Sequence, residues 1–289
     1  MFASFQILIT AMIKPETRPQ QGTLMRSTLT LILAFFMATP SQASQPNRVM
    51  LGKPDENNEQ AFIDIHVPPK PNGTSIIICP GGGYGRVVAG PEGENIAVWL
   101  GEHGITGVVL HYRLPQGRHQ VPLTDAQSAM KHLREHANDL HLDGDKIGVM
   151  GFSAGGHLAS TLATHATTDE LRPAFTVLIY PVITMREHTH GGSKRNLLGP
   201  TPSDKLIKQF SNELRVTPQT PPTFLAHAVD DKPVPPINSK LFHEACKKHK
   251  VPSIYLELPD GGHGLNGYQG PSWDKWQAKS LTWILDLPK

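Results

Sequence analysis

Short apolar runs that alternate with amphipathic stretches most constrain how this chain can fold. The runs at 74–80 (TSIIICP) and 146–152 (KIGVMGF) hold several apolar residues in succession, which is typical of strands covered on both faces. We therefore predict an α/β fold with a mainly parallel sheet and helices on both faces. The strands are expected at 61–68, 74–80, 105–114, 146–152, 175–181, 222–228 and 253–259, and the helices at about 93–103, 122–139, 155–165, 235–249 and 272–285.

One segment interrupts this alternation. Residues 183–220 are polar and rich in Gly, Ser and Pro, so we expect them to form an insertion over the sheet. No linker separates the runs on either side of the insertion. The sequence therefore predicts a single α/β domain over residues 44–289.

The first 43 residues have the pattern of an export signal. Met25 and Arg26 precede an apolar run at 29–38, and Ser41 and Ala43 occupy the −3 and −1 positions of a cleavage site. The apolar run is short for a membrane span, which favours a signal peptide over the alternative, an N-terminal membrane anchor. We predict an N-terminal extension and signal peptide at 1–43, with a secreted or periplasmic protein and no stable membrane insertion after cleavage.

Charge and cysteine content exclude other classes of protein. Lys and Arg number 27 against 25 Asp and Glu, giving a formal net charge of +2 without a long basic tract, so nucleic acid is not an expected partner. Cys79 and Cys246 lie far apart in the sequence and form no disulfide framework. We expect Cys79, at the end of an apolar run, to be a buried free thiol.

A serine between glycines marks the end of the apolar run at 146–152. The sequence Gly151-Phe152-Ser153-Ala154-Gly155 has the pattern Gly-x-Ser-x-Gly, with a strand expected before it and a helix after it. Small neighbours are needed where a tight, strained turn exposes a serine oxygen. The pattern indicates a nucleophilic Ser153, and a serine that only caps a helix is the alternative.

A serine nucleophile needs a base and an acid, and candidates follow in the order typical of this arrangement. Asp230 and Asp231 come directly after the apolar run at 222–228, and His263 stands between glycines after the run at 253–259. The carboxyl ends of parallel strands meet at one edge of the sheet, which brings these side chains together. Either aspartate could be a turn residue or cap instead.

A glycine-rich loop completes the candidate site. The sequence CPGGGYG at 79–85 follows an apolar strand, and its glycines allow backbone N–H groups to approach a substrate oxygen. The N–H of Ala154, directly after the serine, is a second donor. A phosphate-binding loop is excluded because no Lys-Ser/Thr follows the glycines.

These segments resemble the α/β-hydrolase superfamily, and more narrowly secreted bacterial acetylxylan esterase-like enzymes, often labelled xylanases, and feruloyl-esterase-like domains. The similar segments include CPGGGYG, YRLP, KIGVMGFSAGGHLA, PPTFLAHAVDDKPVPPINS and PDGGHGL, within about 61–285. The resemblance implies a nucleophile, acid and base at Ser153, Asp231 and His263. It also implies oxyanion donors at Gly82, Gly83 and Ala154, a substrate contact at Tyr84, and packing or structural roles for His157, Arg113 and Asp125.

The expected activity is hydrolysis of carboxylic esters, with acetyl esters of carbohydrate as the substrate class that the resemblance favours. A small ester or acylated oligosaccharide would be the partner, and no cofactor or metal is expected. A prolyl-oligopeptidase-like peptidase or amidase is the first alternative, and a binding protein without catalysis is the second. A xylanase would need paired carboxylates, and His188 and His190 in the sequence HTHGG are a weak alternative metal site.

Overall fold

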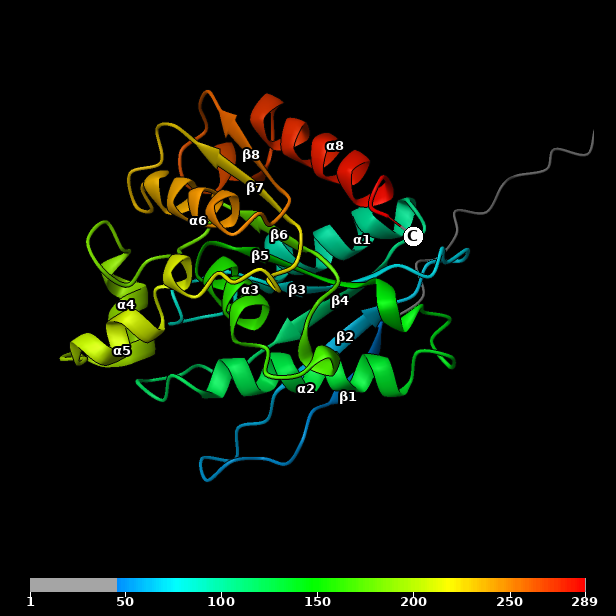
Figure 1. Ribbon diagram of the computed structural model, residues 1–289. Helices are drawn as coiled ribbons and strands as arrows, with labels where there is room; N and C mark the ends of the chain where they lie inside the picture. The colour runs from blue at the N-terminus through cyan, green and yellow to red at the C-terminus, as the bar shows by residue number, and fades with distance from the viewer. Residues whose placement is uncertain (1–45, 289) are drawn as a thin grey trace, which may run out of the picture. The chain divides into compact units, whose positions relative to one another are not determined.

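An eight-stranded sheet forms the centre of the protein in the computed structural model, which describes residues 46–288 (Figure 1). The strand order is β1-β2-β4-β3-β5-β6-β7-β8. Strand β2 pairs antiparallel with both β1 and β4, and all other pairs are parallel. The strands are β1 Asn47–Met50, β2 Phe62–His66, β3 Ser75–Cys79, β4 Thr106–His111, β5 Ile147–Phe152, β6 Thr176–Ile179, β7 Thr223–Ala228 and β8 Ser253–Leu258.

Helices cover both faces of this sheet, and each face has its own apolar core. Residues of α2, α3 and α6 pack on one face, while residues of α1 and α8 pack on the other (Figure 1). Trp99 of α1 and Trp276 of α8 meet edge to face, which places these two helices side by side. The helices are α1 Asn95–Glu102, α2 Val121–Glu135, α3 Ser153–His165, α4 Gly191–Leu198, α5 Asp204–Gln209, α6 Ile237–Lys248, α7 Leu265–Tyr268 and α8 Pro271–Leu285.

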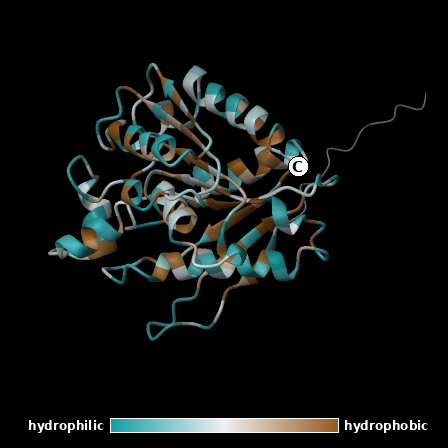
Figure 2. Cartoon of the chain, viewed as in Figure 1, coloured by the Kyte–Doolittle hydropathy of each residue, from teal (hydrophilic) through white to brown (hydrophobic). Residues whose placement is uncertain are grey.

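The apolar runs become strands because both faces of the sheet exclude water. Every residue of β3, β5, β6 and β7 is buried, and Figure 2 shows these central strands as hydrophobic. The expected α/β-hydrolase fold, with its mainly parallel sheet, is confirmed. All seven expected strands are present within a few residues of their expected ends.

Strand β1 was not expected from the sequence. Its residues are mostly exposed and lack an apolar run. It forms because its backbone pairs with β2, and because Arg48 binds the buried Asp64 through two hydrogen bonds of 2.7 and 2.8 Å. Both interactions join segments that are distant in sequence, so no local pattern indicates them.

The segment 183–220 is more ordered than its composition suggested. It contains α4, α5 and a short 3-10 turn at Asn212–Leu214. His190 caps α4 by accepting a hydrogen bond from the Ser193 N–H, and Ser203 caps α5 by accepting one from Leu206. These short helices lie together at one end of the molecule (Figure 1). The short helix α7 after His263 was also not expected.

The structural roles expected for Arg113 and Asp125 agree with the structure. The buried Asp125 carboxylate accepts hydrogen bonds from the backbone N–H and the guanidinium of Arg113, the shortest at 2.5 Å. This pair fastens α2 to the segment after β4. Cys79 and Cys246 are both free and buried.

The predicted signal peptide at 1–43 lies outside the described residues. Within residues 46–288, no helix is both long enough and apolar enough to cross a membrane.

Close packing between α3 and β3 fixes the centre of the fold. A Cβ atom on Gly155 of α3 would lie 2.0 Å from the carbonyl oxygen of Cys79 and 2.4 Å from that of Pro80. Neither backbone carbonyl can move without breaking the end of β3. Glycine is therefore required at position 155 by contact between two backbones.

Replacing Gly155 tests this packing. We expect Gly155→Ala to lower the free energy of unfolding by roughly 2–3 kcal/mol, because overpacking displaces backbone rather than a side chain. Urea unfolding followed by tryptophan fluorescence measures the change. The matched control is Gly144→Ala, where an added Cβ meets nothing within 4 Å, and where we expect a change within about 0.5 kcal/mol. Equal effects of the two substitutions would contradict the argument.

Candidate active site

Ser153 lies on a strained turn between β5 and α3. The strand ends at Phe152 and the helix begins at Ser153, whose φ angle is +52°. A Cβ on Gly151 would lie 2.2 Å from the Gly155 carbonyl oxygen, and one on Gly156 would lie 2.6 Å from the Pro181 Cβ. Because these three nearby glycines have no side chains, the chain turns sharply enough to lift the Ser153 hydroxyl above the sheet edge.

The sheet brings Asp231 and His263 to this serine. Asp231 follows β7 and His263 follows β8, so both lie at the carboxyl ends of parallel strands, as Ser153 does after β5. The His263 Nε2 atom lies 2.9 Å from Ser153 Oγ, and His263 Nδ1 lies 2.8 Å from Asp231 Oδ2. A continuous hydrogen-bonded chain thus runs from the hydroxyl through the imidazole to a buried carboxylate.

The environment of Asp231 keeps its carboxyl group ionised. Burial by itself raises its pKa, but hydrogen bonds from His227 and His263 and from the Val234 N–H outweigh burial and lower that pKa to about 2. An ionised carboxylate only accepts hydrogen bonds. His263 therefore carries its proton on Nδ1, which leaves Nε2 free to accept the proton of the Ser153 hydroxyl.

The two candidate aspartates have different roles. Asp230 Oδ1 accepts a hydrogen bond from the Gly262 N–H at 2.8 Å, so Asp230 fastens the loop that carries His263. Asp231 alone contacts the imidazole. The choice of Asp231, which sequence could make only through family resemblance, agrees with this geometry.

A second histidine, His227, also contacts Asp231 and was missed in the sequence. Its Nε2 faces the Val234 carbonyl at 2.8 Å and Asp231 Oδ2 at 3.2 Å. Both of these atoms are acceptors, so Nε2 must carry the proton. Its Nδ1 lies 2.8 Å from Ser239 Oγ of α6. A lone histidine within the apolar run at 222–228 was the signal available in the sequence.

The glycine loop after β3 is held by its carbonyl groups. Tyr112 donates its hydroxyl to the Pro80 carbonyl at 2.8 Å, and the Val88 N–H donates to the Gly81 carbonyl at 3.0 Å. The Gly82 carbonyl accepts from the N–H of Gly85, and the Gly83 carbonyl accepts from Asn196 Nδ2 at 2.9 Å. Each of these four peptide planes is therefore fixed.

Fixing the carbonyls determines where the amide hydrogens point. Within a trans peptide the N–H points opposite to the C=O. The Gly81 N–H is engaged, because it donates to Glu92 Oε2 at 2.7 Å. Within residues 46–288, no protein acceptor is recorded for the N–H of Gly82, Gly83 or Ala154. Gly82 and Gly83 are thus the loop glycines with amides available to a substrate oxygen.

The prediction for Tyr84 needs correction. Its side chain is 2% exposed, and its hydroxyl lies 2.9 Å from His157 Nδ1 in the core. His157 Nε2 donates to the Phe210 carbonyl, so Nδ1 accepts the Tyr84 hydroxyl proton. Tyr84 thus fastens the glycine loop to α3 and cannot offer its side chain to a substrate. The packing role expected for His157 agrees with the structure.

The insertion at 183–220 contacts the glycine loop directly. Asn196 of α4 holds the Gly83 carbonyl, and a Cβ on Gly83 would lie 3.6 Å from His190 Cε1. His188 and His190 were the weak metal alternative, but His190 Nδ1 lies 2.8 Å from Ser193 Oγ, where it caps α4. In the part of the chain that the structure describes, no three side chains of metal-binding type gather around a common point.

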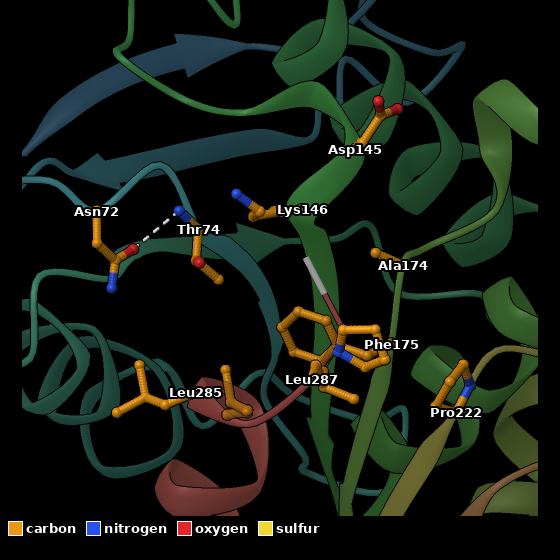
Figure 3. Close-up of a pocket in the computed structure, with 11 residues that line it drawn as sticks. Asn72, Thr74, Asp145, Lys146, Ala174, Phe175, Pro222, Leu285 and Leu287 are labelled. Atoms are coloured by element: carbon orange, nitrogen blue, oxygen red, sulfur yellow. Dashed lines mark hydrogen bonds between the residues drawn. The ribbon is translucent and has the colours of Figure 1, made fainter.

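A cavity of about 490 Å³ lies elsewhere in the molecule (Figure 3). Its lining residues include Thr74, Lys146, Phe175 and Pro222, which directly precede β3, β5, β6 and β7. These are the amino ends of the strands, whereas Ser153 lies beyond the carboxyl end of β5. The cavity is therefore at the opposite edge of the sheet from the candidate active site.

Comparison with known proteins agrees with the fold. A family model described as the alpha/beta hydrolase fold matches residues 100–265, which is more than half of the chain. The chain belongs to this α/β-hydrolase family.

Two relatives within the family have names that refer to xylan. The acetylxylan esterase of Xylanibacter ruminicola is 32% identical over 263 residues, covering 88% of this chain and 54% of that protein. The endo-1,4-beta-xylanase B of Butyrivibrio fibrisolvens is 35% identical over 219 residues, covering 70% of this chain and 34% of that protein. This chain therefore spans about half the length of the first relative and about a third of the second.

A solved structure is similar over nearly its whole length. The acetyl ester-xyloside bifunctional hydrolase of Caldicellulosiruptor lactoaceticus superposes with a TM-score of 0.78 at 34% identity, covering 86% of this chain and 98% of that one. These relatives are consistent with an enzyme of the carboxylic ester hydrolase class.

Asn196 provides a test of the glycine-loop geometry. Without the Asn196 side chain the Gly83 carbonyl loses its partner, and the Gly83–Tyr84 peptide can rotate. That rotation disturbs the adjoining peptide, which carries the Gly83 N–H. We expect Asn196→Ala to lower kcat for 4-nitrophenyl acetate about tenfold, less than the 10²–10³-fold that follows direct loss of an oxyanion donor. Arg195→Ala, an exposed change on the same helix, is the control and should leave kcat unchanged. Equal kcat values for Asn196→Ala and wild type would disprove this role.

His157 should make stability depend on pH. Burial lowers its pKa from 6.5 to about 4, so between these values the unfolded chain binds more protons than the folded one. The stability that the neutral, buried His157 side chain contributes is complete above pH 6.5 and is lost as pH falls toward 4. From pH 7.5 to pH 5 the loss is about 2 kcal/mol.

The measurement is the free energy of unfolding in urea at both pH values. His157→Asn should show a smaller fall between pH 7.5 and pH 5 than wild type, and the exposed change His103→Asn should not alter the fall. Identical pH dependence in wild type and His157→Asn would contradict this assignment.

Proposed function

We propose that this protein is a secreted serine esterase that removes acetyl groups from esterified carbohydrate through a Ser153–His263–Asp231 acyl-enzyme mechanism. The observation that carries the proposal is the hydrogen-bonded chain of these three residues beside a loop with unengaged backbone N–H groups. A nucleophile, a base, an orienting acid and oxyanion donors together are the parts that acyl transfer needs.

Each residue has a defined part in the proposed reaction. Ser153 Oγ attacks the ester carbonyl carbon while its proton passes to His263 Nε2, and Asp231 stabilises the resulting imidazolium. The carbonyl oxygen becomes negative and accepts hydrogen bonds from the N–H groups of Gly82, Gly83 and Ala154. His263 then returns the proton to the leaving alcohol oxygen, which releases the alcohol and leaves an acetyl group on Ser153.

Water completes the cycle by the same path. His263 takes a proton from a water molecule, whose oxygen attacks the acetyl carbonyl carbon. The second tetrahedral intermediate uses the same donors, and its collapse releases acetate. The proton passes from His263 to Ser153 Oγ, which restores the resting hydroxyl.

Three observations support the substrate class. One relative is named for acetylxylan and a solved relative for acetyl esters and xylosides. The signal-like sequence at 1–43 fits a protein that meets polymeric carbohydrate outside the cell. The insertion at 183–220 brings polar residues such as His190 beside the glycine loop, which suits a polar alcohol group.

The test compares wild type with Ser153→Ala on acetylated xylan fragments and on 4-nitrophenyl acetate, with acetate release as the readout. We expect wild type to release acetate from both and the variant to lose roughly 10³-fold or more of the activity. His263→Ala should lose activity similarly, whereas His103→Ala, an exposed histidine at the end of α1, should not.

Other outcomes separate the alternatives. Activity on the small ester alone would keep the mechanism and reject acetylated xylan as the substrate. Hydrolysis of a peptide or amide in preference to both esters would favour the peptidase alternative. Cleavage of 4-nitrophenyl xyloside that survives Ser153→Ala would require a second set of catalytic residues. Inactivity of the folded wild type on all of these would favour a binding protein on a hydrolase fold.

A further inference from the structure

A buried carboxylate behind the glycine loop, Glu92, has no part in the mechanism above. It lies in the short π-helical turn Gly90–Glu94 that leads into α1, and it is 3% exposed. Its oxygens accept three hydrogen bonds: from the Gly81 N–H at 2.7 Å, from the Tyr180 hydroxyl at 3.0 Å and from the Tyr268 hydroxyl at 3.2 Å. Gly81 lies in the glycine loop, the Tyr180 ring contacts the His263 ring, and Tyr268 lies in the short helix after His263.

The first donor links Glu92 to the oxyanion loop. Gly81 directly precedes Gly82 and Gly83. A Cβ on Gly81 would lie 2.7 Å from Glu92 Oε2 and 2.9 Å from Ser153 Cβ. Gly81 is thus confined between the carboxylate and the nucleophile. The position of the loop above Ser153 therefore depends on where the Glu92 carboxylate lies.

The other two donors link Glu92 to the base. Tyr180 follows β6, and its ring lies 5.0 Å from the His263 ring in an edge-to-face contact. Tyr268 ends α7, the short helix that begins two residues after His263. A single carboxylate therefore connects the loop of the oxyanion donors with Tyr180, which contacts His263, and with Tyr268 in the short helix that follows His263.

Burying a carboxylate is costly, so a carboxylate in the core needs contacts that compensate for the loss of water. Of the other buried aspartates, Asp64 and Asp125 each bind an arginine, and Asp231 binds two histidines. Among residues 46–288 no ion pair is recorded for Glu92, and burial raises the pKa of its carboxyl group. Three neutral donors compensate for the loss of water.

We infer that Glu92 is a positioning residue, which holds the Gly82 and Gly83 amides at the height of the developing oxyanion and keeps the oxyanion loop in register with the His263 loop. This inference rests on the proposed function, since it concerns the same reaction. It predicts that Glu92 contributes through the geometry of its hydrogen bonds, so that a neutral group of the same shape can replace it.

Two substitutions separate geometry from charge. Glu92→Ala removes the acceptor for all three donors. Glu92→Gln keeps an amide oxygen that can accept from Gly81, and its NH₂ group can donate to the two tyrosine oxygens. We expect Glu92→Ala to lower kcat for 4-nitrophenyl acetate about 100-fold with KM within about threefold, the size of losing one oxyanion donor.

The conservative variant should restore activity. We expect Glu92→Gln to retain kcat within about threefold of wild type, with the acid limb of the pH profile of kcat/KM at an unchanged pH. Glu94→Gln, an exposed change two residues along the same turn, is the matched control and should behave as wild type. Tyr268→Phe, which removes one donor, should lower kcat severalfold while the Tm stays within a few degrees.

The outcomes distinguish failure of this inference from failure of the proposed function. Wild-type esterase activity that Ser153→Ala abolishes supports the function on its own. Given that result, a folded Glu92→Ala protein with kcat within twofold of wild type would overturn the inference. Equal losses in Glu92→Gln and Glu92→Ala, with a shifted acid limb, would overturn it in favour of a charge effect on His263. If Glu92→Ala does not fold, an unchanged kcat in Tyr268→Phe would overturn it.

Discussion

Contact between the backbones of α3 and β3 is the constraint on which the rest of the site depends. Gly155 approaches the Cys79 and Pro80 carbonyls so closely that no side chain fits. This contact places the first turn of α3 directly beside the glycine loop, which continues from the same carbonyls. Ser153 and Ala154 at the helix start and Gly82 and Gly83 in the loop therefore face a common space. The strained φ angle of Ser153 persists because this packing leaves the chain no alternative path.

The glycines of the loop would allow it many backbone conformations, but hydrogen bonds from the rest of the fold hold it in one. Three of its carbonyls are held from different parts of the fold: by Tyr112 after β4, Val88 before α1, and Asn196 in α4. The fourth, that of Gly82, is held by the Gly85 N–H within the loop. Preorganised donors lower a barrier only when they need no reorganisation during the reaction. Glycines supply the tight turns and unusual φ angles, and distant residues supply the rigidity. The unengaged amides are thus a product of the whole domain.

How much of this could be read from the sequence depends on the range of each interaction. The strands and the Ser153 turn follow from local patterns of apolar residues and glycines, and His263 followed from chain order. Asp231 needed family resemblance, because Asp230 beside it satisfies the same local pattern. The role of Asn196 arises from a contact across 113 residues, and the contact of Glu92 with Tyr268 spans 176. Tyr84 was misassigned because the sequence places it in the glycine loop but does not give the direction of its side chain.

The insertion at 183–220 therefore has two functions that constrain it differently. Exposed residues of the insertion, such as Arg195, can change without reaching the glycine loop. Residues of the insertion that support the loop cannot change freely. Asn196 binds the Gly83 carbonyl. The Phe210 carbonyl accepts from His157, which in turn accepts from the Tyr84 hydroxyl. A change in the insertion that reshapes the space for the alcohol group must keep these two attachments. Specificity can thus vary through this segment only around the residues that also keep the oxyanion donors in place.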